Sequence, residues 1–98
     1  MVRLLVLYNP PEDPAAFEKY YNEIHIPLAK QLPGLVRYTI SRGLAANAQY
    51  YLVAELDWAD MASARAALRS PEGAAATADM AKFATTGASS LLFEVAEV

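Results

Sequence analysis

The sequence contains no cysteine and only one histidine, His25. The absence of cysteine excludes disulfide bonds, thiolate metal ligands and a cysteine nucleophile, and it is compatible with a reducing compartment, so we expect a cytoplasmic protein. A single histidine without cysteine argues against a transition-metal site. The four glycines form neither a phosphate-binding loop nor a dinucleotide fingerprint, so we predict no metal and no organic cofactor.

Basic charge and long apolar runs are also lacking. The eight Lys and Arg residues are scattered and are outnumbered by eleven Asp and Glu, which gives a formal net charge of -3. Nucleic acids and anionic membranes are recognised by basic patches, so neither is expected as a partner. No segment approaches the length of a transmembrane helix. The apolar run 1–8 is too short for a secretory signal, and Asn9-Pro10-Pro11 ends it.

The chain is instead rich in apolar residues. Its 98 residues are 55% hydrophobic and 19% charged, and this length predicts one domain that spans residues 1–98. A domain of this size buries only a modest fraction of its surface. An apolar content this high therefore indicates that a second subunit covers part of the surface.

The hydrophobic pattern predicts the order β-α-β-β-α-β, which is the ferredoxin-like split unit of the α+β class. Such a unit has a four-stranded antiparallel sheet with helices on one face. Pro27 lies inside the first helical pattern, so we expect that helix to kink or break around His25. The first and last strands carry apolar residues on both faces, and the simplest cover for the open face is an identical sheet, which predicts a homodimer. The expected strands are 2–8, 35–42, 49–58 and 89–98, and the expected helices are 14–32, 61–69 and 71–84.

His25 is the natural candidate for proton transfer near neutral pH. Tyr21 lies four residues earlier, so its phenol shares a helix face with the imidazole. The same face carries apolar side chains, which would direct the imidazole toward apolar surroundings. The alternative is structural: His25 would order the kink at Pro27, and Tyr20 and Tyr21 would be core residues.

Two acidic residues form a second candidate. Glu55 and Asp57 share one face of the third predicted strand, where they could act as an acid pair. Alternation on a solvated strand explains them more simply.

The chain resembles the EthD-like group of dimeric α+β barrel proteins, named after an ethyl tert-butyl ether degradation protein. The resemblance rests on the N-terminal apolar strand, on Tyr20-Tyr21 followed by His25-Ile26-Pro27-Leu28, and on Pro33-Gly34-Leu35 before the second strand. It implies a homodimer whose two sheets form one barrel, with a pocket between each sheet and its helices. Family members are associated with aromatic or polyketide-type molecules. Relatives act as decarboxylases, isomerases or cofactor-free oxygenases, and many carry a reductase label.

Two hypotheses about function follow. The first is a cofactor-independent enzyme for a hydrophobic, aromatic or polyketide-like molecule, in which His25 is the general acid or base and Tyr21 orients it or binds a substrate oxygen. The second is a non-catalytic dimeric protein that binds a hydrophobic molecule, or an accessory component of an ether- or aromatic-degradation oxidoreductase system. Membership of a larger oxygenase is a further alternative. The residues expected to contact substrate are Phe17, Tyr20, Leu5, Leu7 and Tyr38.

Overall fold

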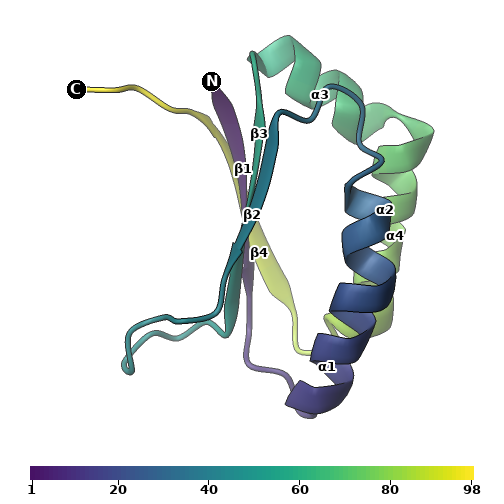
Figure 1. Cartoon of the computed structure of the whole chain (residues 1–98), viewed down its shortest axis with the longest axis vertical. Helices are drawn as coiled ribbons and strands as arrows, with labels where there is room; N and C mark the ends of the chain where they lie inside the picture. Colours follow the sequence, from purple (N-terminus) through teal and green to yellow (C-terminus); the bar gives the residue numbers. More distant parts are fainter.

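The computed structural model describes residues 1–98 and has the predicted order of elements. A layer of helices packs against one face of a twisted sheet, and the other face carries no helix (Figure 1). The strands are β1 (Val2–Tyr8), β2 (Arg37–Ser41), β3 (Leu52–Trp58) and β4 (Ala88–Glu94). The helices are α1 (Pro14–Tyr20), the π-helical η1 (Tyr21–His25), α2 (Ile26–Ala29), α3 (Met61–Arg69) and α4 (Pro71–Phe83).

The sheet has the strand order β2-β3-β1-β4, and every neighbouring pair is antiparallel. Both central strands therefore pair on two sides, and β2 and β4 are the edges. This arrangement is the predicted ferredoxin-like α+β fold. Its last strand is shorter than expected because β1 begins at Val2, so the pairing closes with the bond from the Val95 N–H to the Met1 carbonyl.

The helix that follows β1 continues past Pro27, although residues 21–25, just before the proline, have π-helical geometry. It begins at a cap, where the Asp13 carboxylate accepts from the Ala16 N–H at 3.1 Å. Residues 21–25 then widen into a π-helical turn, with the Ile26 N–H bonded to the Tyr21 carbonyl, and Pro27 stands in the first turn of α2. The expected irregularity around His25 is present, but it is a π-turn and not a break. Such turns are often found at functional sites.

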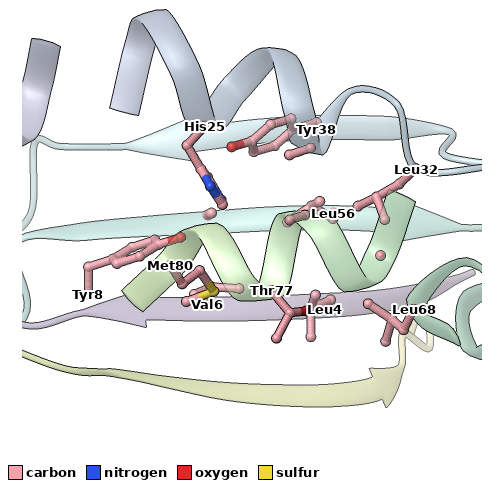
Figure 2. A pocket seen from close by; sticks show the side chains of 14 residues that line it. Leu4, Val6, Tyr8, His25, Leu32, Tyr38, Leu56, Leu68, Thr77 and Met80 are labelled. Carbon is pink, nitrogen blue, oxygen red and sulfur yellow. The ribbon is translucent and has the colours of Figure 1, made fainter. Parts of the chain in front are cut away.

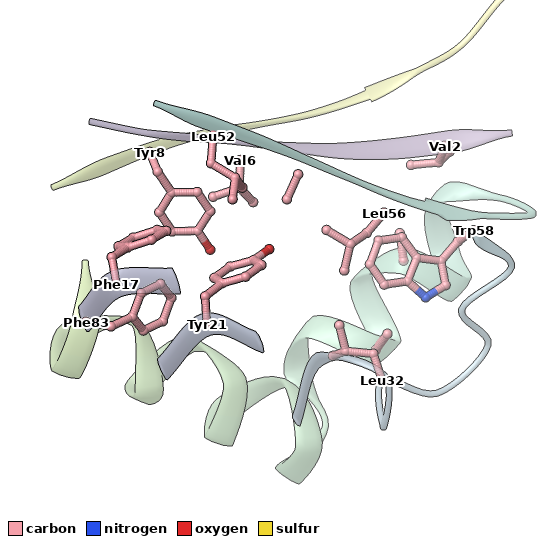
Figure 3. Packing of buried hydrophobic residues seen from close by; sticks show 13 residues of the cluster. Val2, Val6, Tyr8, Phe17, Tyr21, Leu32, Leu52, Leu56, Trp58 and Phe83 are labelled. Atoms are coloured by element: carbon pink, nitrogen blue, oxygen red, sulfur yellow. The ribbon is translucent and has the colours of Figure 1, made fainter. Parts of the chain in front are cut away.

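The core lies between the sheet and the helices. Aromatic rings from β1, α1, η1 and α4 meet at one end, and Trp58 is fully buried at the other (Figure 3). The Tyr8 ring lies 5.7 Å from Phe17 and 5.6 Å from Phe83. The Trp58 indole N–H donates to the Pro33 carbonyl at 3.0 Å. Large side chains of this kind contribute about 1.5–3 kcal/mol each when fully buried, so this layer fixes the helices against the sheet.

The open face is the side of the sheet that the helices leave uncovered. Leu5 and Leu91 are paired on it, and Phe93 lies opposite Arg3. Leu91 is 57% exposed and Phe93 36%. The predicted apolar character of this face is therefore present. The residues of the open face are Arg3, Leu5 and Leu7 of β1, Arg37, Thr39 and Ser41 of β2, Val53, Glu55 and Asp57 of β3, and Ser89, Leu91 and Phe93 of β4.

Charged residues at one end of the open face form an ion-pair cluster. The Arg3 guanidinium donates from Nε and Nη2 to the two Asp57 oxygens at 2.8 and 3.1 Å, and its Nη1 lies 3.6 Å from Glu55. Asp57 is only 3% exposed. The expectation that Asp57 is a solvated strand residue is wrong, because the arginine covers it.

None of the helices has both the length and the apolar character needed to cross a bilayer.

Candidate functional site

His25 lies at the last position of η1 and is 5% exposed. Its Nδ1 lies 3.0 Å from Oδ2 of Asp79, which comes from the middle of α4. The π-turn and α4 are in contact, so the widened helix brings the imidazole to a carboxylate 54 residues away in the sequence. The only histidine of the chain is thus part of a buried polar pair.

Asp79 accepts a second hydrogen bond from the other side. The Tyr20 hydroxyl donates to Oδ1 at 2.5 Å, so each carboxylate oxygen has its own partner. Asp79 itself is 4% exposed. A buried carboxylate is tolerated when it is hydrogen-bonded in this way. The three side chains form one chain of bonds that links α1, α4 and η1.

Phe83 supports this chain of bonds on its apolar side. The centroid of its ring is 4.6 Å from that of His25 and 5.6 Å from that of Tyr20, the latter in a stacked arrangement. Because Phe83 is one turn after Asp79 on α4, the same helix face supplies both the hydrogen-bond acceptor and the ring that holds its two partners.

A cavity between the sheet and the helices reaches His25. Figure 2 shows the imidazole extending into it, with the hydroxyls of Tyr8 and Tyr38 directed toward the same space. The volume is about 50 Å³, which accommodates a few water molecules or one small polar group. Most of the wall is apolar. The lining residues are Leu4, Val6, Tyr8, His25, Ala29, Leu32, Tyr38, Ala54, Leu56, Leu68, Gly73, Ala76, Thr77 and Met80.

Burial and hydrogen bonding determine the charges of the His25–Asp79 pair. Burial lowers the pKa of His25, and the Asp79 carboxylate opposes this effect only in part. Burial by itself would raise the pKa of Asp79, but the hydrogen bonds from Tyr20 and His25 outweigh it and lower that pKa. Near neutral pH the pair is therefore a neutral imidazole beside an ionised carboxylate. A neutral imidazole at an apolar cavity can accept a proton.

Tyr21 does not bond to His25. Its hydroxyl lies 2.6 Å from that of Tyr38 on β2, and its ring centroid is 5.4 Å from that of the imidazole. Burial raises the pKa of Tyr21 far above its ordinary value, so this phenol does not act as a base. In this structure the hydrogen-bond partner of His25 is Asp79, and the contact of Tyr21 with His25 is one of ring packing.

Of the five residues expected to contact substrate, only Tyr38 lines this cavity. Leu5 and Leu7 are on the open face, because β1 turns Leu4, Val6 and Tyr8 toward the helices. The structure therefore places Leu5 and Leu7 outside this cavity.

Phe17 and Tyr20 lie elsewhere. The Phe17 ring is 4% exposed and packs in the core. Tyr20 reaches Asp79, and both aromatic residues also border a separate groove beside residues 11–13.

Sequence reasoning missed Asp79 and Tyr8. A signal for Asp79 was present, since it follows Ala76 by three residues and precedes Phe83 by four, which places an acid on the buried stripe of a helix. An acid at such a position needs a buried partner, and His25 was the available one. No group of three or more His, Asp and Glu side chains is arranged to hold a metal ion.

Comparison with known proteins identifies the family. The model of the EthD domain family matches residues 9–87. A protein of Rhodococcus erythropolis, described as an uncharacterized 11.0 kDa protein in the thcB-thcC intergenic region, is 39% identical over 94 residues, which cover 93% of this chain and 91% of that one. The crystal structure of an ethyl tert-butyl ether degradation (EthD) family protein of Bacillus halodurans has a TM-score of 0.91 at 33% identity, with 98% of this chain and 99% of that chain covered.

More distant solved structures share the fold. SnoaB of Streptomyces nogalater, a cofactor-independent oxygenase, has a TM-score of 0.70 at 21% identity over 99% of this chain and 94% of its own. A dimeric ferredoxin-like protein of unknown function from Thermobifida fusca has a TM-score of 0.71 at 21% identity over 96% and 90%. At these identities the likeness concerns the fold alone, whereas the domain match and the two relatives above 30% identity establish that the chain belongs to the EthD domain family.

Proposed function

We propose that this protein is a cofactor-independent enzyme that acts on a hydrophobic, aromatic or polyketide-like molecule, with His25 as the general acid or base. Residues 1–98 form one domain that works as a homodimer through the open face. The observation that carries the proposal is the buried His25–Asp79 pair at the wall of an apolar cavity, with Nδ1 and Oδ2 3.0 Å apart.

The lowered pKa of His25 supports a role as base. Burial keeps the imidazole neutral near pH 7, so it is ready to take a proton from a substrate carbon or phenol. The proton then resides on the imidazole, and the substrate is left as an enolate or phenolate. Return of the proton to a different substrate atom completes an isomerisation without any other reactant. Decarboxylation needs only the same acid–base group, and oxygenation would in addition consume molecular oxygen.

The size of the cavity at His25 supports an elongated substrate. A volume of about 50 Å³ is too small for an aromatic ring system, since ligand sites typically measure about 300–1,000 Å³. A hollow of about 260 Å³ adjoins it beneath β4 and shares Leu4, Val6, Leu68, Thr77 and Met80. A substrate that occupied both would have its polar end at His25 and its apolar body beneath the edge strand.

The open face supports the homodimer. Leu91 and Phe93 are exposed on it beside Leu5, and an apolar sheet face of this kind is normally covered. The T. fusca protein of the same fold is dimeric. Two open faces packed against each other would give the barrel implied by the family resemblance.

Turnover by His25 variants tests the enzyme proposal. The purified protein is incubated with a panel of polycyclic phenols and hydrophobic carboxylic acids, and products are followed by mass spectrometry. We expect His25→Ala and His25→Gln to abolish turnover while the protein stays folded. Glu23→Ala, an exposed residue of the same π-turn, is the matched control and retains activity. A large loss of stability with turnover retained contradicts the proposal.

A second function, a non-catalytic binding or accessory protein, is favoured by one observation. The R. erythropolis relative is encoded between thcB and thcC, a position typical of a component that works with its neighbours. This function requires binding that is insensitive to His25→Gln and to pH between about 5 and 8, around the ordinary pKa of histidine. A bell-shaped pH dependence of turnover would exclude it.

A further inference from the structure

Asp79 is buried on an alanine-rich helix and has two different donors. The Tyr20 hydroxyl lies 2.5 Å from Oδ1, and Nδ1 of His25 lies 3.0 Å from Oδ2. A fully buried acid of this kind is expensive to place on a helix face that packs against the core. A simple packing role for this position would be met by another alanine, as at Ala76 one turn earlier.

The chemistry of the two contacts fixes the position of a proton. An ionised carboxylate only accepts hydrogen bonds, so the phenol and the imidazole must both donate. The proton of neutral His25 is therefore on Nδ1, and Nε2 carries the free electron pair. The ring extends from η1 into the cavity (Figure 2). Nε2 is thus the nitrogen left available to a molecule bound there.

We propose that Asp79 is a positioning residue that, with Tyr20 holding its second oxygen, fixes His25 in the Nδ1–H tautomer and keeps Nε2 available as a base. The tautomer is a property of the protein without ligand. Its consequence for catalysis rests on the function proposed above.

The surroundings of His25 explain why the imidazole needs a residue that positions it. Phe83 covers the pair from one side, with its ring 4.6 Å from the imidazole, and the cavity wall is apolar on the other. No other side-chain acceptor is hydrogen-bonded to the imidazole. The carboxylate would also stabilise the imidazolium that forms when Nε2 takes a proton.

Tyr20 completes the arrangement from α1. It occupies Oδ1, so the carboxylate cannot rotate freely and Oδ2 stays directed at His25. The stacking of Tyr20 on Phe83 holds the phenol in turn. Removal of this hydroxyl leaves the acceptor in place, so we expect a smaller effect from Tyr20→Phe than from any change at Asp79.

The test is the ¹⁵N NMR spectrum of the imidazole in ligand-free protein, where the single histidine gives one pair of nitrogen signals. The ¹⁵N shifts of Nδ1 and Nε2 and their couplings to the ring protons report the tautomer directly. The wild type and Tyr20→Phe are expected to show mainly the Nδ1–H form. Asp79→Leu removes both acceptors at similar volume, and the Nε2–H form should gain population several-fold.

Asp79→Asn is the second variant, for use where the leucine variant does not fold. Its amide nitrogen replaces one of the two accepting oxygens and only donates, so Tyr20 and His25 cannot both keep their acceptor, and the Nδ1–H population should fall below that of the wild type. Asp57→Asn makes the same change at another buried aspartate, on the open face, and should leave the tautomer unchanged. A wild type in the Nε2–H form, or Asp79 variants with the wild-type ratio, would overturn the proposal.

Turnover separates this inference from the proposed function. With an active wild type, we expect Asp79→Asn to lower kcat at least tenfold with a smaller change in KM. If no compound is turned over, the function fails, whereas the tautomer in the ligand-free protein still decides the role of Asp79. If turnover is found and Asp79→Asn leaves kcat unchanged, the positioning role is wrong and the enzyme proposal stands.

Discussion

The hydroxyls of Tyr21 and Tyr38 lie 2.6 Å apart and join the π-turn to the edge strand β2. Tyr21 is fully buried, so Tyr38→Phe would leave a buried hydroxyl without its partner. We expect a loss of about 1–3 kcal/mol in the free energy of unfolding, measured by urea denaturation. The Tyr21→Phe/Tyr38→Phe double variant should lose less than the sum of the two single variants. Strict additivity would show that the bond contributes nothing.

His25 should make stability depend on pH. Burial lowers its pKa in the folded state below the ordinary value of 6.5, so below that pH the unfolded chain binds the additional proton. The contribution of neutral His25 is therefore complete above about pH 6.5 and is lost as the pH falls, by about 1.4 kcal/mol for each unit of pKa difference.

The comparison of the wild type with His25→Gln isolates this effect. The melting temperatures of both proteins are measured between pH 5 and 7.5, and the advantage of the wild type should grow as the pH rises. Asp79 does not obscure the trend, because its pKa is lowered from 3.8 and it stays ionised in this range. A constant difference across the range would mean that the histidine is not held neutral.

Much of the fold follows from local signals in the sequence. The alternation of Leu52, Ala54 and Leu56 sets the buried face of β3. Asp60 and Ser70 cap α3 and α4 by accepting from Ser63 and Gly73, three residues further along the chain. These features depend on neighbours in the sequence, so they can be predicted without tertiary structure. The orientation of β1 could not, because both of its faces are apolar and alternation does not distinguish them.

The candidate site was harder to predict because its residues are far apart in the sequence. His25 was identified from its chemistry, but its partner Asp79 is 54 residues away and Tyr20 is 59 residues from Asp79. Only the packing of η1 and α1 on α4 brings them together. The nearest tyrosine in the sequence, Tyr21, bonds across to β2 instead.

The open face gives a prediction about assembly. Leu91→Asp places a charge in the apolar part of this face, opposite Leu5, where a paired sheet would bury it without a partner. We expect the mass measured by light scattering to fall from that of a dimer to that of a monomer. Ile24→Lys is the control, because Ile24 is also exposed and apolar but lies on η1, away from the sheet. A dimer that survives Leu91→Asp, or one lost in the control, would show that another surface forms the interface.

Gly73 is required by the close approach of α3 and α4. A Cβ atom there would collide with the backbone carbonyl oxygens of Ala67 and Leu68, which cannot move aside as a flexible side chain could. Alanine is the better helix former by about 1 kcal/mol, yet we expect Gly73→Ala to destabilise the protein by about 1–3 kcal/mol because overpacking outweighs propensity. At Gly43 a Cβ atom meets nothing within 4 Å, so Gly43→Ala should change stability by less than about 0.5 kcal/mol. Urea unfolding of the two variants measures both values, and equal stabilities would mean that the helices separate at little cost.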